Sequence, residues 1–392
     1  MLLLAASLAR GCSGVRPVVA ERIIEMLNAG AVPVVPEVGS VGASGDLAPL
    51  AHIALALTGE APTATGTIAP LKLEAKEGLA LINGTHLMAA QAALLCADMD
   101  HLVDAAMLAT AMSIDACKGT DAFLDPRVYA ARNQPGPAAA ARRLAALLAG
   151  SQIIPSHRKD DPRIQDPYSL RCAPMVIGSA MDALGYVKQA VVNELGAVTD
   201  NPLVFADAGA RPIVSAGNFH GMPMAIPLDV LAIAISHIAG ISERRTYFLL
   251  SATDSENPIP AYLSPLPGLH SGLMIAQYTA AACCNEIIGL CTPASVANIS
   301  TSAGIEDYNS FGPRAAAKAR RALELATNVV SIELICSAEA IEYHRPLRSG
   351  AGVERGHAAV RKRVLRLTHD RPLGPDIHSV CEIIRRGEFG GA

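Results

Sequence analysis

The sequence predicts a mainly α-helical protein, built as a bundle of long helices with a few short strands in its loops. Of its 392 residues, 51% are hydrophobic and 17% are charged, so the chain can bury a large core and is not disordered. It contains 6 Phe, 8 Tyr and no Trp, and a core of Ala, Leu, Ile and Val favours packed helices. Several apolar stretches exceed 20 residues, and helices of that length span a whole domain at about 1.5 Å per residue.

Apolar residues recur at helical spacing in six segments, which are separated by stretches rich in Gly, Pro, Asn, Asp and Ser. The predicted helices are Val18–Leu27, Gly84–Leu108, Pro174–Leu195, Pro227–Leu250, Gly272–Leu290 and Ala315–Ala340. The main predicted loops are Val32–Pro49, Thr58–Leu71, Asp121–Pro137, Gly150–Gln165, Val198–His220, Ser251–Gly268 and Thr292–Phe311. Short strands are expected around Gly66–Lys72 and Leu203–Val214. No repeat or linker marks a boundary, so residues 1–392 are predicted to form a single domain.

Charge and cysteine usage exclude several classes of function. The chain has 32 basic and 36 acidic residues, a net charge of −4, and no long run of either sign, which argues against a nucleic-acid partner. Its nine cysteines are scattered, odd in number and without a CxxC pair, so neither a disulfide framework nor a zinc site is predicted. We expect small thiols in a reducing compartment and no metal.

The apolar N-terminal segment Met1–Ala9 requires a check for a signal peptide. A basic region before it is absent, and Arg10 interrupts the place of a cleavage site. We therefore expect this segment to be the end of a buried helix. The uncharged stretch Asn257–Asn285 is broken by four prolines, so it is not predicted to span a membrane. The expected location is the cytoplasm.

The most informative segment contains the triplet Ala43-Ser44-Gly45, in a glycine-containing loop ahead of an apolar helix with Asp46 as its candidate N-cap. The spacing fits neither a phosphate-binding loop nor a GxSxG nucleophile. Because Gly45 has no Cβ, its amide nitrogen can approach the carbonyl carbon of Ala43. Ring closure with loss of two waters would give a methylidene-imidazolone, an electrophile that the standard side chains do not supply. Three small residues in a loop are common, so the triplet alone does not establish that this ring forms.

Longer motifs, in order along the chain, give the triplet a context. Gly39–His52, which includes the triplet, resembles the prosthetic-group signature of the aromatic amino acid ammonia-lyases, in the histidine-type form. Further matching segments are Glu77–Thr85, Gln165–Cys172, Thr199–Leu203, Ser215–His220, Ser242–Arg245, Ser271–Gln277, Pro293–Ser302 and Arg371–Asp376. The resemblance covers essentially the whole chain. It implies the all-α fold of the fumarase/aspartase type and a homotetramer whose subunits share active sites.

The resemblance also assigns roles. Ala43, Ser44 and Gly45 would form 4-methylidene-imidazol-5-one autocatalytically, with no external cofactor. Asn83 would hydrogen-bond the imidazolone oxygen, although Asn83-Gly84 by itself predicts only a turn. Phe219 would pack against the prosthetic group.

Substrate contacts are expected from the Tyr/Arg segment. The planar guanidinium of Arg171 suits bidentate binding of an amino acid carboxylate. If this segment is helical, Tyr168, three residues earlier, shares the face of Arg171; the resemblance implies a part in proton transfer. Gln165 would position the substrate. Without the motif, each of these residues reads as an ordinary surface or structural residue.

Glu306 is the residue that indicates the substrate. It resembles the acidic residue of histidine-type enzymes, where phenylalanine- and tyrosine-type enzymes tend to carry an amide. A carboxylate suits a basic or hydrogen-bonding ring such as imidazole. Met274 also matches the histidine-type pattern.

Some features depart from the family pattern. Only 42 residues precede the triplet, where members usually have a longer segment that carries a loop with a second catalytic tyrosine. Leu4 and Ala6 stand where Arg and Asn are usual; Ala173 and Met175 replace Gln; Met222 replaces an acidic residue. A truncated chain, a loop supplied by another polypeptide, and a loss of activity all account for these differences.

Two classes of function follow. The first is a carbon–nitrogen lyase that removes ammonia from an aromatic L-amino acid, foremost L-histidine to trans-urocanate, with a phenylalanine or tyrosine lyase or an aminomutase as the alternative. The second is a non-catalytic, truncated subunit with the lyase fold. The retained triplet, Asn83, Tyr168, Arg171 and Glu306 favour the first.

Overall fold

The computed structural model describes residues 1–159, 161, 163–206, 209, 212–252, 257 and 259–390, and it is mainly α-helical, as predicted. The chain divides into two compact units, each assembled from three segments. The first unit comprises Met1–Cys96, Tyr186–Leu231 and Thr292–Ala319; the second comprises Ala97–Gly185, Ala232–Cys291 and Arg320–Ala392. Four long helices contribute residues to both units: α5 (His86–Ala116), α10 (Ala173–Leu195), α11 (Met222–Ser251) and α13 (Gly312–Ile341). The single domain over residues 1–392 stays a prediction.

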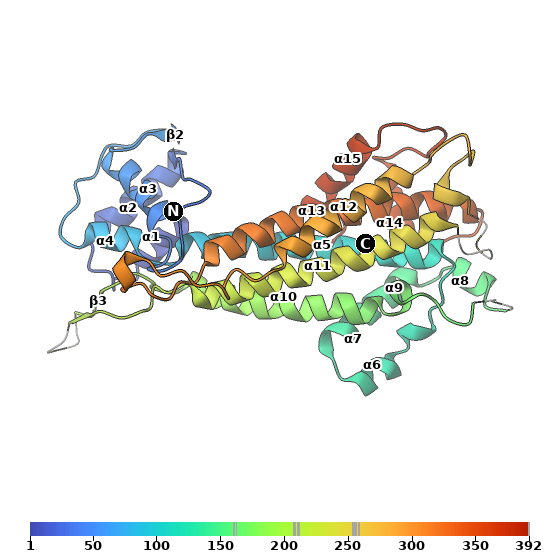
Figure 1. The fold of residues 1–392 in the computed structure, drawn as a ribbon, viewed down its shortest axis with the longest axis horizontal. Helices are drawn as coiled ribbons and strands as arrows, with labels where there is room; N and C mark the ends of the chain where they lie inside the picture. Colours follow the sequence, from blue (N-terminus) through green and yellow to red (C-terminus); the bar gives the residue numbers. More distant parts are fainter. Residues whose placement is uncertain are drawn as a thin grey trace. The chain divides into compact units, whose positions relative to one another are not determined.

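Small helices form the core of the first unit. They are α1 (Leu2–Leu8), α2 (Pro17–Asn28), α3 (Leu47–Thr58) and α4 (Glu77–Ile82), the blue part of Figure 1. Leu4, Ile23, Met26, Leu57 and Leu81 are fully buried in one cluster. The apolar N-terminal segment is thus helix with a buried face, as predicted.

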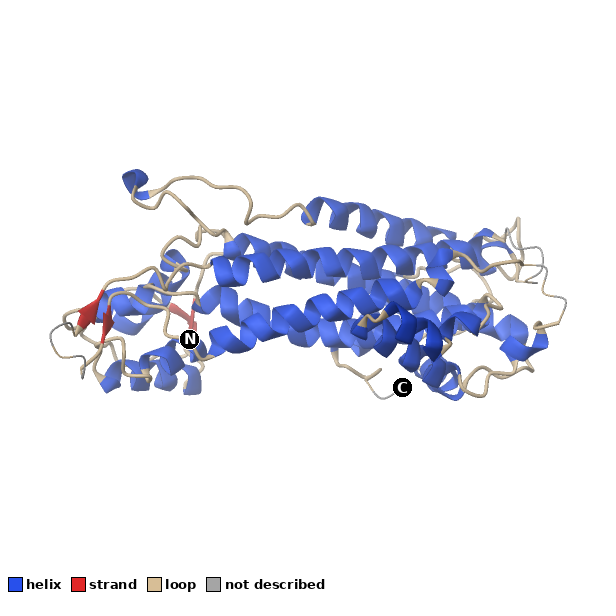
Figure 2. Ribbon diagram, turned by 90° about the horizontal axis from the view of Figure 1, so that it is seen from below, coloured by secondary structure: helices blue, strands red, loops and turns tan. Residues whose placement is uncertain are grey.

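Two short antiparallel sheets also belong to the first unit (red in Figure 2). β1 (Val32–Pro33) pairs with β2 (Thr63–Thr65), and β3 (Leu203–Val204) pairs with β4 (Ile213–Val214). The second pair confirms the strands expected around Leu203–Val214, part of which lies outside the described residues. The strand expected around Gly66–Lys72 is wrong. The observed strand β2 ends at Thr65, and the φ of +63° at Gly66 turns the chain out of the extended conformation. A 3₁₀ turn, η3 (Ser302–Gly304), precedes α13.

The second unit adds shorter helices around its parts of the four long ones. They are η1 (Ala122–Leu124), α6 (Pro126–Arg132), α7 (Pro135–Leu148), α8 (Ile153–Ser156), α9 (Tyr168–Arg171), η2 (Ala261–Leu263), α12 (Met274–Leu290), η4 (Glu342–His344), α14 (Ala351–Arg361) and α15 (Gly374–Arg385). The predicted loop Asp121–Pro137 is therefore wrong. Pro126 and Pro135 are the first residues of α6 and α7, where a missing N–H costs nothing, and Asp125 caps α6 by accepting from the Arg127 amide at 2.9 Å.

The predicted long helices are present with shifted ends. α5 runs past Leu108 to Ala116, and α11 begins at Met222, so Pro227 lies inside it. Within the described residues, α11 has the length and composition of a membrane span, but 61% of its most apolar window is buried, as in a core helix. The nine cysteines, all of them among the described residues, form no disulfide, and five are buried.

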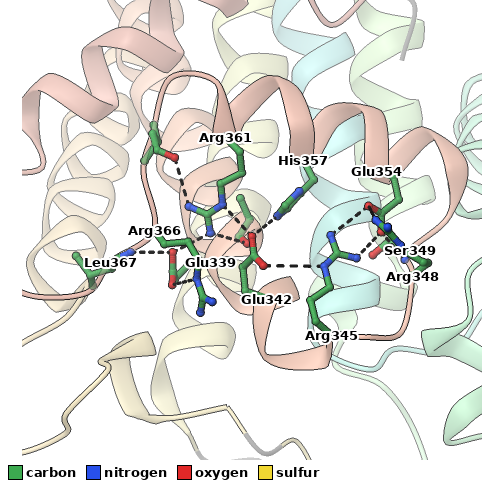
Figure 3. A network of polar contacts seen from close by, with 12 residues as sticks. Glu339, Glu342, Arg345, Arg348, Ser349, Glu354, His357, Arg361, Arg366 and Leu367 are labelled. Carbon is green, nitrogen blue, oxygen red and sulfur yellow. Dashed lines mark hydrogen bonds and ion pairs between the residues drawn. The ribbon is translucent and has the colours of Figure 1, made fainter.

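A network of charged side chains surrounds the C-terminal end of α13 in the second unit (Figure 3). The Arg361 guanidinium contacts Glu339 at 2.8 Å and Glu342 at 3.3 Å. Arg345 contacts Glu354 at 2.6 Å, and the His357 Nε2 lies 3.0 Å from Glu342. These pairs tie α13, η4 and α14 together.

A second polar cluster lies in the apolar interior of the same unit. Arg245 of α11 and Glu333 of α13 are both fully buried, and two hydrogen bonds of 2.5 and 2.8 Å join them. Glu333 also accepts from Ser113 of α5 and Ser242 of α11, each at 2.6 Å. Three long helices are thereby fixed in register, because each charge would be costly if its partner moved away.

Replacing Arg245 alone by Met should lower the free energy of unfolding by about 3–5 kcal/mol, because Glu333 is left buried and unpaired. The double variant Arg245→Met/Glu333→Met should recover most of that loss, since two apolar side chains of similar volume need no partner. Urea unfolding followed by circular dichroism measures both. Equal destabilisation of the two variants would contradict the pairing argument.

Candidate active site

The triplet lies in a loop of the first unit that admits no larger residues. Gly42 and Gly45 have φ values of +67° and +76°. A Cβ on Gly45 would stand 2.0 Å from the Gly84 carbonyl oxygen, and one on Gly42 would stand 2.2 Å from the Ser310 Oγ. Both glycines are therefore required by the backbone and by close contact.

Two backbone hydrogen bonds join this loop to the turn after α4. The Asp46 amide donates to the Gly84 carbonyl at 2.7 Å, and the Gly84 amide donates to the Ser44 carbonyl at 3.2 Å. Asn83 ends α4 beside this turn and is 5% exposed. The Ser44 carbonyl oxygen, which would become the ring oxygen, thus has a backbone donor next to the predicted Asn83. The contact of the Asn83 side chain stays a prediction.

Glu306 reaches the triplet from a distant part of the sequence. The Ser44 hydroxyl donates to the Glu306 Oε1 at 3.1 Å. Thr301 holds the same carboxylate, because its hydroxyl donates to Oε2 at 2.9 Å and its amide donates to the Glu306 carbonyl at 2.9 Å.

Phe219 is half-buried in the same unit, and the neighbouring His220 Nε2 lies 2.9 Å from the Tyr308 carbonyl oxygen. Packing of Phe219 on the triplet stays a prediction.

The other predicted residues belong to the second unit. Tyr168 and Arg171 lie on the one-turn helix α9, and the guanidinium carbon stands 4.6 Å from the centre of the tyrosine ring. The predicted helical turn is present. Arg171 donates to the Asp166 carbonyl at 2.9 Å and to the Gln165 side chain at 2.7 Å. Tyr168 is 70% exposed, although the Arg171 guanidinium lies over its ring.

Side chains that the sequence analysis did not single out hold these segments. The buried Asp166 accepts from the Thr120 amide at 2.8 Å and the Thr120 hydroxyl at 2.7 Å, and Arg245 donates to the Ser169 carbonyl at 3.3 Å. Met274 is the first residue of α12 and half-buried. The loop before it is fixed by the Asp370 carboxylate, which accepts from the Ser271 and Gly272 amides at 2.8 and 3.0 Å. An Asp inside or near a matched motif is the signal that could have identified Asp166 and Asp370.

Comparison with known proteins identifies the family. Residues 1–362 match the family model described as aromatic amino acid lyase. This chain belongs to that family. It is 46% identical to a histidine ammonia-lyase of Anaeromyxobacter sp. (strain K), over 99% of this chain and 80% of the relative. Its structure is similar to that of histidine ammonia-lyase from Trypanosoma cruzi, with a TM-score of 0.91 and 38% identity over 99% of this chain and 75% of the other. Tyrosine aminomutase from Streptomyces globisporus gives the same TM-score at 32% identity, covering 99% and 79%.

The residues of this aromatic amino acid lyase fit the imidazolone. Ring closure joins the Gly45 nitrogen to the Ala43 carbonyl carbon, and Gly45 offers no Cβ to block it. Ala43 is 4% exposed, so the reacting carbonyl lies away from bulk solvent. The Gly84 amide is placed to stabilise negative charge on the Ser44 oxygen. Within the described part of the chain, no group of three His, Cys, Asp or Glu could hold a metal ion.

Asp46 is the N-cap residue of α3, as predicted, but its side chain makes no capping hydrogen bond to that helix. Its carboxylate instead accepts from the Leu87 and Met88 amides of α5 at 2.9 and 3.1 Å, and the Ser40 hydroxyl donates to it at 3.3 Å. Asp46 is fully buried, and burial raises its pKa to about 7. The neighbouring His86 is 7% exposed, and burial lowers its pKa to about 4.

These two shifts act on stability in opposite directions. Asp46 keeps its proton in the folded chain, so its contribution falls as pH rises from about 4 to about 7. His86 stays neutral in the folded chain, so its contribution falls as pH drops from about 6.5 to about 4. Relative to the unchanged protein, Asp46→Asn should gain stability towards pH 7, and His86→Gln should gain stability towards pH 4. Urea unfolding between pH 4 and 7 measures this, and parallel curves for all three proteins would contradict both assignments.

Proposed function

We propose that this chain removes ammonia from L-histidine and releases trans-urocanate, through an imidazolone formed from Ala43, Ser44 and Gly45. The observation that carries this proposal is the triplet loop, in which Gly84 faces the Ser44 carbonyl oxygen and Glu306 faces its hydroxyl. The 46% identity to a protein named histidine ammonia-lyase supports histidine as the substrate. The similarity to a tyrosine aminomutase leaves the aminomutase outcome as the alternative to be measured.

Each residue has a defined part in the proposed reaction. The bound imidazolone supplies an electrophile that activates the substrate for elimination. Arg171 binds the substrate carboxylate, and Gln165 holds its guanidinium. Tyr168 moves a proton in the elimination, as the family resemblance implies. Glu306 accepts a hydrogen bond from the substrate ring, which favours imidazole over phenyl.

Three remaining residues also take part in the proposed reaction. Asn83 hydrogen-bonds the ring oxygen beside the Gly84 amide, Phe219 packs against the ring, and Met274 contacts the substrate. We further infer one ammonia-lyase domain over residues 1–392, a cytoplasmic location and no external cofactor.

Ser44→Ala should abolish urocanate formation, because alanine cannot lose the side-chain water that creates the electrophile. Absorbance assays with L-histidine, L-phenylalanine and L-tyrosine measure each unsaturated acid, and chromatography detects any β-amino acid product. Turnover of phenylalanine or tyrosine without histidine would overturn the substrate assignment. Unchanged activity of Ser44→Ala would overturn the lyase mechanism.

Arg171→Lys should reduce kcat/KM by about 10²-fold for every amino acid substrate, because a lysine cannot make the bidentate contact. Arg158→Lys is the matched control, since Arg158 is 64% exposed and pairs with Asp121 on the surface. The control should retain full activity. A fall in kcat/KM for histidine alone would show that Arg171 contacts the substrate ring and not the carboxylate.

We also propose a homotetramer that shares active sites among its subunits. Large apolar side chains are exposed in both units: Val38 and Ile305 at 87% and 85% in the first, Ile164 and Leu269 at 98% and 78% in the second. These exposed apolar side chains are close in sequence to predicted site residues, and they suit subunit interfaces. Light scattering at micromolar concentration should give four times the chain mass of 40.6 kDa; a stable monomer would contradict the proposal.

A further inference from the structure

We propose that Glu306 also serves the chain's own maturation, by delivering the proton with which the Ser44 hydroxyl leaves as water. This inference rests on the proposed function, because it concerns the formation of the same imidazolone. It gives Glu306 a task that precedes any substrate.

The position of the carboxylate carries the proposal. Glu306 Oε1 lies 3.1 Å from the Ser44 Oγ, the atom that must leave. The Thr301 hydroxyl fixes the other oxygen at 2.9 Å, and the Thr301 amide fixes the backbone of Glu306. The carboxylate is therefore oriented at the leaving atom by two separate contacts. Asp46, the carboxyl group next in sequence to the triplet, is bound instead to the Leu87 and Met88 amides.

The chemistry requires a proton at that atom. In the first step, the Gly45 nitrogen bonds to the Ala43 carbonyl carbon, and the carbonyl oxygen leaves as water with the hydrogens of the Gly45 and Ser44 amides. In the second step, the Ser44 Cα hydrogen passes to solvent water, and its electron pair forms the Cα–Cβ double bond as the Cβ–Oγ bond breaks. For this step the Glu306 carboxylate first takes up a proton from solvent and then gives it to Oγ across the 3.1 Å contact, so that neutral water departs.

The surrounding backbone supports this order of steps. Once the ring has closed, negative charge released at the Ser44 Cα can spread onto the Ser44 carbonyl oxygen. The Gly84 amide donates to that oxygen at 3.2 Å and stabilises the charge. The hydrogen bond of Glu306 is to the Ser44 hydroxyl, whereas ring closure joins the Gly45 nitrogen to the Ala43 carbonyl carbon. The carboxylate should therefore act on the second loss of water.

Intact mass measurement of freshly purified protein tests the proposal without an activity assay. The unchanged chain should weigh less than its sequence by two waters, about 36 Da. Glu306→Gln, which keeps the shape but cannot transfer a proton, should lose one water, about 18 Da, and retain the Ser44 hydroxymethyl group in its tryptic peptide. Thr301→Val should retain part of the hydroxyl, because Glu306 loses its orienting contact. Circular dichroism confirms that each variant is folded.

Arg171→Lys is the matched control, because Arg171 belongs to the second unit and makes its described contacts with Gln165 and Asp166. This variant should lose both waters, about 36 Da, even though its turnover is impaired. A full loss in Glu306→Gln overturns the proposed role, and no loss in that variant places Glu306 in ring closure instead, which also overturns it. An unmodified mass in the unchanged chain would overturn the proposed function itself.

Discussion

The close approach of two glycines is the constraint on which the triplet loop depends. Gly45 and Gly84 meet with no room for a Cβ on Gly45, and a Cβ on Gly84 would stand 2.5 Å from the Thr199 Oγ1. This approach allows the paired hydrogen bonds that run from Asp46 to Gly84 and from Gly84 to Ser44. The same contact that holds the loop also leaves a donor on the oxygen where charge would gather. The Gly84 amide and the Ser44 carbonyl oxygen therefore serve both the folding of the loop and the proposed chemistry.

Burial explains why the polar groups around this loop are unusual. Asp46 is fully buried, yet two amides of α5 and the Ser40 hydroxyl satisfy its carboxyl oxygens. The cost of removing a charge from water raises its pKa to about 7 despite those donors. A carboxyl group placed in this way ties the loop to the first turn of a long helix. It stabilises the position of the triplet without facing the Ser44 hydroxyl.

In the second unit, buried polar side chains also fix the turn that carries Tyr168 and Arg171. The buried Arg245–Glu333 pair joins α11 to α13, and Arg245 extends a further hydrogen bond of 3.3 Å to the Ser169 carbonyl. Asp166 and Thr120 hold the segment just before α9. A four-residue helix has too few internal hydrogen bonds to be stable alone. Its conformation, and hence the orientation of Arg171, depends on these contacts from longer helices.

The sequence by itself determined the helical class, the long helices, the triplet and the family. These depend on local composition and on motifs in a fixed order, which need no knowledge of contacts. It also placed Tyr168 and Arg171 on one turn, because three-residue spacing is a local property. Tertiary structure alone decided that the Asp46 side chain binds amides of α5 and makes no capping hydrogen bond to α3, and that Glu306 reaches the Ser44 hydroxyl. Both depend on segments far apart in the chain, such as Ser44 and Glu306, which are 262 positions apart, and only the packing of the core brings such segments together.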